Sequence, residues 1–108
     1  MTDFVHLHNH SDYSLLDAAQ TVEMMCNRAY DLNMDSIAIT DHGNLFAMLP
    51  FYQQAIKTGI KPIIGCEIYV SIKGHREKKQ VITTTGKKWG YHHLVLLAQN
   101  YEGYKNLM

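Results

Sequence analysis

An alternation of short apolar runs with helical stripes constrains the fold of this chain more than any other feature. Residues 36–40 are almost wholly apolar and residues 61–70 largely so, as in strands covered on both faces. Between them, apolar residues recur at helical spacing over 45–56 and stop at Gly59, which suits a left-handed helix end. A similar stripe over 21–33 precedes the first run. This order favours parallel strands joined by right-handed crossovers.

The remaining segments are less regular. Residues 4–8 predict a first strand, and residues 91–98 and 100–108 predict a fourth strand and the start of a helix. Residues 71–90 lack a helical stripe, carry six lysines and arginines against one acidic residue, and are long for a connection. We interpret them as a solvated, mobile loop. A segment that contacts phosphate or nucleic acid is the alternative, although its aromatic residues lie only at one end.

Composition narrows the class of protein. The chain has 108 residues, with ten basic and ten acidic side chains, so no global field favours nucleic acid or an anionic membrane as a partner. A hydrophobic content of 46% is ordinary for one globular domain. Cys26 and Cys66 fall in a predicted helix and strand. With no signal peptide or long apolar run, we expect reduced packing cysteines in a cytoplasmic protein without membrane contact.

The densest group of potential metal ligands is an alternating run of histidines near the N-terminus. In an extended segment His6, His8 and His10 share one face. A strand can therefore hold two or three imidazoles within reach of one cation. The alternative is that one or two of them are ordinary, partly buried histidines.

Further polar residues follow the other predicted strands. His42 comes just after the second strand, Glu67 lies toward the end of the third, and Asp17 lies on the loop after the first. Because the exits of parallel strands gather on one rim, we expect these side chains beside His8 and His10. Glu67 lies in an apolar strand, where an unpaired buried carboxylate is costly and requires a cation or a strong hydrogen-bond partner.

His93 and Asp41 leave alternatives open. His93 opens the fourth strand, so a parallel arrangement would place it at the opposite rim, whereas an antiparallel return would keep it near the other ligands. Its neighbour His92 faces the other way and is expected to be structural or solvent-facing. Asp41 could orient His42 from outside the coordination sphere, or could equally cap the loop.

The types of ligand indicate a transition metal. Mixed imidazole and carboxylate donors suit zinc, manganese or iron better than calcium. They are too many for one tetrahedral ion, so we expect two or three metals that share bridging carboxylates. Such a cluster activates water and clamps both oxygens of a phosphate ester. The residues therefore predict phosphoester hydrolysis by metal-activated water, with no side chain assigned as the catalytic group.

Several segments resemble the N-terminal PHP (polymerase and histidinol phosphatase) domain of bacterial replicative DNA polymerases, the DNA polymerase III α subunits. They are residues 6–17, 39–45 and 59–67, continued by 92–98 and 103–107. The resemblance implies an α/β fold, the N-terminal portion of a distorted (β/α)7 barrel, here with about four strands and two to three helices. It also implies up to three divalent metal ions, zinc or manganese, and a phosphoesterase that in some members is a 3′–5′ proofreading exonuclease.

Carried over position by position, the family's metal ligands fall on His8, His10, Asp17, His42, Glu67 and His93. His6 would support them from below. The family's remaining ligands, a cysteine and an Asp-x-His pair, belong to later strands. We therefore interpret residues 1–108 as the N-terminal fragment of a single PHP domain, without the rest of the barrel and the polymerase domains. Because so few strands cannot close a barrel, we expect the fragment to self-associate and to be inactive alone.

The resemblance leaves competing functions. The first is a metal-dependent exonuclease or phosphoesterase within a DNA-directed DNA polymerase, with DNA and other replicase subunits as partners. The second is a metal-stabilised scaffold on which the polymerase and a separate proofreading subunit assemble. The third, a stand-alone phosphatase, is disfavoured by the sequence context of residues 40–45 and by the basic insertion.

Overall fold

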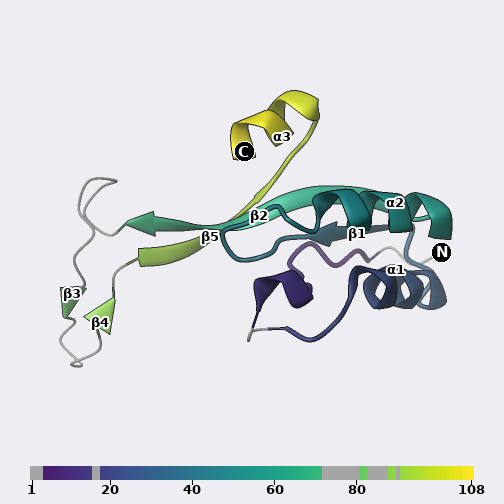
Figure 1. The fold of residues 1–108 in the computed structure, drawn as a ribbon, viewed down its shortest axis with the longest axis horizontal. Coiled ribbons are helices and arrows are strands. Elements are labelled where there is room, and N and C mark those ends of the chain that lie inside the picture. The colour runs from purple at the N-terminus through teal and green to yellow at the C-terminus, as the bar shows by residue number, and fades with distance from the viewer. Residues whose placement is uncertain (1–3, 16–17, 72–80, 83–87, 90) are drawn as a thin grey trace.

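A three-stranded mixed sheet organises the chain in this computed structural model, which describes residues 4–15, 18–71, 81–82, 88–89 and 91–108 (Figure 1). In this sheet β2 is central, parallel to β1 and antiparallel to β5. The strands are β1 (Ser36–Ile39), β2 (Lys61–Ser71), β3 (Val81–Ile82), β4 (Lys88–Trp89) and β5 (Tyr91–Leu97). The helices are the short 3-10 helix η1 (Asp12–Ser14), α1 (Val22–Asp31), α2 (Met48–Thr58) and α3 (Tyr101–Leu107).

The helices begin and end close to where the sequence predicts. Thr21 caps α1, because its hydroxyl accepts a hydrogen bond from the Met24 N–H at 3.2 Å. Gly59 ends α2 with a φ of 85°, a left-handed conformation that favours glycine. The start of α2 differs from the prediction, since the helix begins at Met48 and not at Leu45. Among the described residues, no helix is long and apolar enough to cross a membrane.

One hydrophobic core lies between α1, α2 and β1. The sides of α1 and α2 that pack there carry Met25, Cys26 and Phe51, all essentially inaccessible to solvent. Every residue of β1 is buried, which confirms a strand covered on both faces. Both cysteines are buried and free, as expected of packing residues. Figure 1 shows α1 and α2 at one end of the sheet, while β2 and β5 extend beyond them at the other.

The prediction of a first strand over 4–8 is wrong as secondary structure, although the segment does run beside β1. The Ala38 N–H donates to the His6 carbonyl at 3.1 Å, and the Thr40 N–H donates to the Asn9 carbonyl at 2.8 Å. Between these bonds, the Asn9 side-chain amide donates to the Ala38 carbonyl at 2.9 Å. A side chain thus satisfies a β1 carbonyl that a backbone N–H would meet in a regular ladder.

The fourth predicted strand, β5, returns antiparallel to β2, so the hairpin-like alternative is confirmed. Its register pairs Tyr69 with His93 and Glu67 with Val95. Within the predicted loop over 71–90, β3 and β4 form a short antiparallel pair, so this stretch is not wholly irregular. The rest of that predicted loop, apart from Ser71 in β2, lies outside the described residues.

Candidate metal centre

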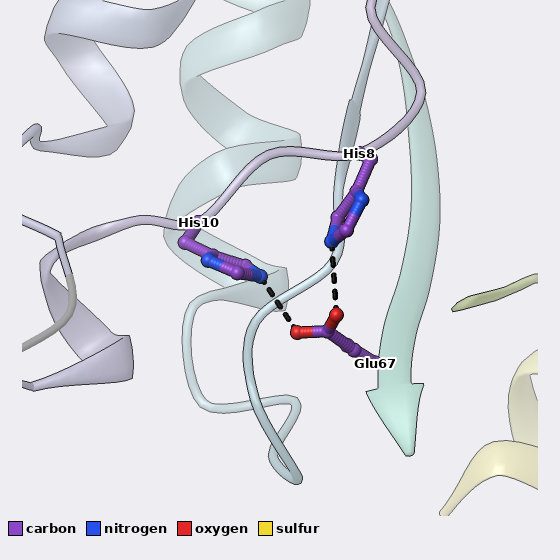
Figure 2. A group of neighbouring side chains, drawn as sticks. All are labelled: His8, His10 and Glu67. Carbon is purple, nitrogen blue, oxygen red and sulfur yellow. Dashed lines mark hydrogen bonds and ion pairs between the residues drawn. The ribbon is translucent and has the colours of Figure 1, made fainter. Parts of the chain in front are cut away.

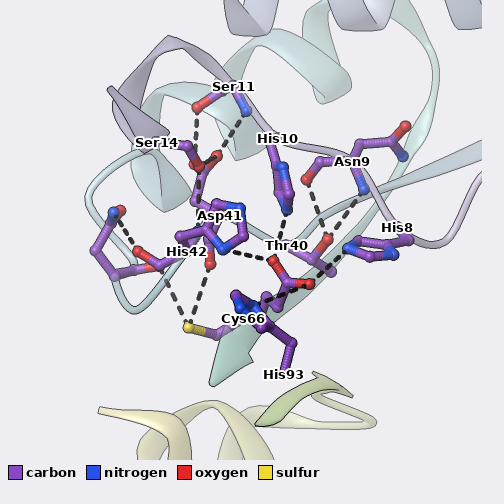
Figure 3. A network of polar contacts seen from close by, with 12 residues as sticks. His8, Asn9, His10, Ser11, Ser14, Thr40, Asp41, His42, Cys66 and His93 are labelled. Atoms are coloured by element: carbon purple, nitrogen blue, oxygen red, sulfur yellow. Dashed lines mark hydrogen bonds and ion pairs between the residues drawn. The ribbon is translucent and has the colours of Figure 1, made fainter. Parts of the chain in front are cut away.

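Glu67 is the centre of a cluster of imidazoles. Its side chain is only 6% exposed, yet ring nitrogens of histidines from distant parts of the chain approach both carboxylate oxygens (Figures 2 and 3). Oε1 lies 3.1 Å from His8 Nε2 and 3.6 Å from His93 Nδ1. Oε2 lies 2.9 Å from His10 Nε2 and 2.6 Å from His42 Nδ1. The structure therefore brings together five of the six predicted ligands.

The β1–β2 ladder places His42 beside Glu67. Beyond the end of β1, one further parallel bridge joins these two residues. The Glu67 N–H donates to the Asp41 carbonyl at 3.0 Å, and the Glu67 carbonyl accepts from the Gly43 N–H at 3.0 Å. Gly43 has a φ of 61°, which lets the chain turn away immediately after His42. Strand exits thus converge here, as the βα order predicts.

The antiparallel direction of β5 delivers His93 to the same place. His93 is directly opposite Tyr69, and Val95 is directly opposite Glu67. Residues paired across strands share a face, and so do alternate residues along a strand. Glu67 and His93 therefore lie diagonally on one face of the sheet. His92, paired with Val70, takes the opposite face and is exposed, as expected.

Asp41 fastens the histidine segment to the end of β1. Its buried carboxylate accepts hydrogen bonds from the Ser11 N–H at 2.6 Å, the Ser11 hydroxyl at 2.7 Å and the Ser14 hydroxyl at 2.7 Å (Figure 3). The Ser14 hydroxyl in turn accepts from the His42 N–H at 3.1 Å. Charge-assisted bonds of this kind are strong when buried. Of the two roles considered for Asp41, these bonds support the loop cap.

Thr40 and Asn9 hold the backbone between the first two ligands. The Thr40 hydroxyl accepts a hydrogen bond from the Asn9 N–H at 3.0 Å. The same hydroxyl donates to the Asn9 carbonyl at 3.1 Å. Sequence reasoning missed these two residues, and also Ser11 and Ser14. For Asn9, Ser11 and Ser14 the only signal was the polar composition of the segment around η1, which has no regular period, and for Thr40 it was a polar side chain at the end of the apolar run over 36–40.

Three further residues remain to be placed: His6 and Asp17, which the sequence predicts to support or bind the metals, and Cys66, which it predicts to be a packing residue. The His6 ring is exposed and packs edge-on against Phe4 with centroids 4.8 Å apart, while its backbone carbonyl bonds to β1. Its proposed support of the ligands therefore stays a prediction. Asp17 lies outside the described residues. Cys66, adjacent to Glu67, points its Sγ at the Asp41 and Asn44 carbonyls, 3.5 and 3.6 Å away.

The electrostatics of the cluster favour an ionised Glu67. Burial alone raises the pKa of its carboxyl group, but the surrounding imidazoles, His42 and His10 first, outweigh burial and lower the pKa below its ordinary value. Burial instead raises the pKa of the neighbouring Cys66 thiol. Glu67 is therefore a carboxylate at neutral pH, whereas Cys66 is a protonated donor that braces the turn after β1.

The donor set fits divalent transition metals. It contains two groups whose ligand atoms all lie within 4.8 Å of one another: His8, His10 and Glu67, and His42, Glu67 and His93. Each group offers two imidazole nitrogens and a carboxylate oxygen, the donors that zinc and manganese accept. Because Glu67 belongs to both groups, it can bridge two cations. The arrangement is that of a mixed α/β protein with a histidine-rich cluster of potential metal ligands at the strand exits.

Comparison with known proteins assigns the family. Residues 6–108 match the family model described as PHP domain, and the chain belongs to that family. It is 51% identical over 105 residues to the DNA polymerase III subunit alpha of Borreliella burgdorferi, covering 97% of this chain and 9% of that protein. The corresponding protein of Treponema pallidum is 45% identical, with the same coverages. That of Helicobacter pylori strain 26695 is 44% identical, with coverages of 97% and 8%.

Solved structures share the fold. An amidohydrolase from Chromobacterium violaceum, solved with sulfate bound and no metal, aligns with a TM-score of 0.64 and 25% identity. The alignment covers 95% of this chain and 31% of that one. A Bifidobacterium adolescentis protein, provisionally described as a metal-dependent phosphoesterase, aligns with a TM-score of 0.52 and 20% identity, covering 64% and 23%. The predicted partial (β/α) fold of PHP type is thereby confirmed.

Proposed function

We propose that this chain carries the metal-binding part of a phosphoesterase site, in which Glu67 bridges two divalent cations. His8 and His10 complete one ligand group and His42 and His93 the other, with Asp17 as a further ligand. The observation that supports this most directly is a buried carboxylate approached by imidazoles from three separate segments of the chain. A purely structural contact would need only one of these partners.

The histidines of the proposed site differ in how far they are exposed to solvent. His10 and His42 are largely buried, whereas the side chains of His8 and His93 are 54% and 44% exposed. The site is therefore most open on the side of His8 and His93, where a phosphate group can approach. When bound, zinc or manganese supplies an acidic water and withdraws charge from phosphate oxygens. Glu67, kept ionised by the imidazoles, balances the positive charge.

The relatives support a proposal for the substrate. Because the chain matches DNA polymerase III subunit alpha from several bacteria, we propose that the phosphoester is the 3′ end of DNA and that the activity is proofreading within a replicative polymerase. DNA and other replicase subunits would be its partners. The chain spans about a tenth of the length of these relatives, so this function concerns a longer polypeptide.

A metal-stabilised scaffold is the second candidate, and β5 supports it. Leu94, Leu96 and Leu97 are each exposed by more than a third, which is typical of a strand that packs against further protein. The same exposed residues support the self-association of residues 1–108. A monomer in size-exclusion chromatography over a wide concentration range would contradict that association.

The metal centre is tested by replacing its shared ligand. We expect the chain to bind manganese or zinc with a rise in melting temperature. Glu67→Gln should abolish both the binding and the rise, because both groups lose their shared negatively charged carboxylate and one of its two oxygens. Equilibrium dialysis and thermal unfolding with and without metal measure this. Glu23→Gln, at an exposed acid in the first turn of α1, is the control.

The outcomes separate the candidates. Metal binding that survives Glu67→Gln would refute the proposed centre. Metal binding accompanied by manganese-dependent release of nucleotides from single-stranded DNA by the intact polymerase subunit, lost in its Glu67→Gln form, would establish the exonuclease. Metal binding without release in the intact subunit would support the scaffold.

A further inference from the structure

The face of the sheet that carries Glu67 and His93 continues into a pair of tyrosines. Tyr69 follows Glu67 by two residues in β2, and Tyr91 precedes His93 by two in β5. Alternate residues of a strand share a face, and cross-strand partners do too, so all four side chains lie on the same side. The tyrosines therefore extend the candidate metal centre along the sheet, by roughly 7 Å for two residues of strand.

The two tyrosine rings lie together and against the histidines. Their centroids are 4.6 Å apart, and the His93 ring lies 5.4 Å from Tyr69 and 5.5 Å from Tyr91. The His42 and Tyr69 rings are parallel within 1°, with centroids 6.5 Å apart. This spacing is that of packed aromatic side chains. The group is continuous, from the ligand rings to the tyrosines.

The turn after His42 leaves room for this arrangement. A β-carbon at Gly43 would lie 3.0 Å from Tyr69 Cε2, so a larger residue there would press on the ring. Despite this packing, Tyr69 remains 49% exposed and Tyr91 remains 46% exposed. Large aromatic surfaces are thus held in place and still open to solvent, immediately beside the open side of the site.

We propose that Tyr69 and Tyr91 form a stacking platform for an unpaired nucleobase of the strand whose phosphate is held at the Glu67 cluster. This inference rests on the proposed phosphoesterase function and specifies its substrate class as single-stranded nucleic acid. Every base has an aromatic face, and stacking on tyrosine requires that the base be unpaired. The platform therefore selects a frayed or single-stranded end over a paired one. It also favours a nucleotide over a phosphate ester that lacks a base.

The test separates the base from the phosphate. A short 5′-labelled oligothymidylate and an abasic oligomer of equal length carry the same phosphates but differ in the bases. We expect fluorescence anisotropy, in manganese buffer, to show about tenfold tighter binding of the oligothymidylate, within the range of a single base–aromatic stack. Tyr69→Leu and Tyr91→Leu should bring the ratio of the two affinities close to one, whereas Tyr69→Phe should preserve it.

Tyr52 provides the matched control. It lies on α2, outside the ring group at the site, and is 48% exposed, so Tyr52→Leu removes an equivalent exposed ring and should leave the ratio unchanged. Equal affinities for the two oligomers in the unmodified chain would overturn the proposal. So would a ratio that survives both Tyr69→Leu and Tyr91→Leu, or one that falls equally in Tyr52→Leu.

Manganese binding, measured separately by equilibrium dialysis, keeps the two proposals distinct. The tyrosine variants should bind manganese as the unmodified chain does, because no tyrosine belongs to either ligand group. Manganese binding that persists in Glu67→Gln counts against the metal centre, whatever the base ratio. Normal manganese binding with no preference for bases counts against the platform alone.

Discussion

β1 and β5 flank β2 on its two sides and have opposite environments. All of β1 is buried between α1, α2 and β2, whereas no residue of β5 is buried. β2 passes from one environment to the other, since residues 65–67 are buried and residues 69–70 are exposed. Glu67 is the last buried residue before that change. The candidate metal centre therefore lies at the boundary, where the core can position a carboxylate and the open sheet leaves it accessible.

The largest effect is expected when one apolar side chain in each region is truncated to alanine and the two losses of stability are compared. Phe51 is fully buried in the core, so Phe51→Ala should lower the free energy of unfolding by about 3–5 kcal/mol. Leu94 on β5 is 46% exposed, so Leu94→Ala should lower the free energy of unfolding by less than about 1 kcal/mol. Urea denaturation followed by circular dichroism measures both. Similar losses for the two variants would mean that β5 is covered in solution, as in a self-associated form.

A smaller effect is expected where the two regions join. A β-carbon at Gly65 would lie 2.5 Å from the Leu96 carbonyl oxygen and 2.8 Å from Leu97 Cδ2. Gly65→Ala should therefore push β5 away and cost about 1–3 kcal/mol. His93 moves with β5, so the group formed by His42, Glu67 and His93 should lose manganese affinity, while His8 and His10 retain theirs.

Equilibrium dialysis over a range of manganese concentrations distinguishes the two ligand groups in that variant. Gly59→Ala is a useful comparison, because nothing lies within 4 Å of its added carbon, although its φ of 85° strains alanine. It should lower stability without changing manganese binding. Equal loss of metal at both groups in Gly65→Ala would indicate that β5 supports the whole centre.

A last predicted effect appears only at high pH and concerns the buried core. Burial raises the pKa of the Cys26 thiol to about 11, from an ordinary value of 9.0. The unfolded chain then loses this proton at lower pH than the folded chain, so the contribution to stability is complete below pH 9.0 and is lost as pH rises toward 11. Two pKa units correspond to at most about 2.7 kcal/mol, so we expect a loss of roughly 2 kcal/mol by pH 11. Thermal unfolding of Cys26→Ala against pH should lack this component, and an unchanged profile would contradict it.

Much of the fold follows from local patterns. The stripe from Val22 gives α1, Gly59 ends α2, and the apolar run from Ser36 gives a buried strand, because periodicity and end signals are short-range properties. Local patterns could not show that the extended segment 4–10 forms no regular strand. Its pairing depends on Asn9 bonding to a residue far along the chain.

Only part of the candidate site could be predicted from the sequence. That Glu67 needs partners follows from its apolar neighbours, and that His8, His10 and His42 lie near it follows from the rule of strand exits. Ser11 and Ser14 could not be predicted as part of the site, because their hydroxyls bind Asp41, which is distant in sequence. The residues next to them in the sequence give no sign of that contact. The tyrosine platform likewise depends on the register of β2 and β5.

The sequence by itself determined the βα order, the buried strand, the helix ends and the supply of imidazole and carboxylate donors, because each depends on a residue and its near neighbours. Only the tertiary structure decided that β5 runs antiparallel, that His93 therefore reaches Glu67, and that Asp41 clamps the segment around η1. Strand direction and register are set by pairing between distant segments, and the free energy of that pairing belongs to the packed chain as a whole.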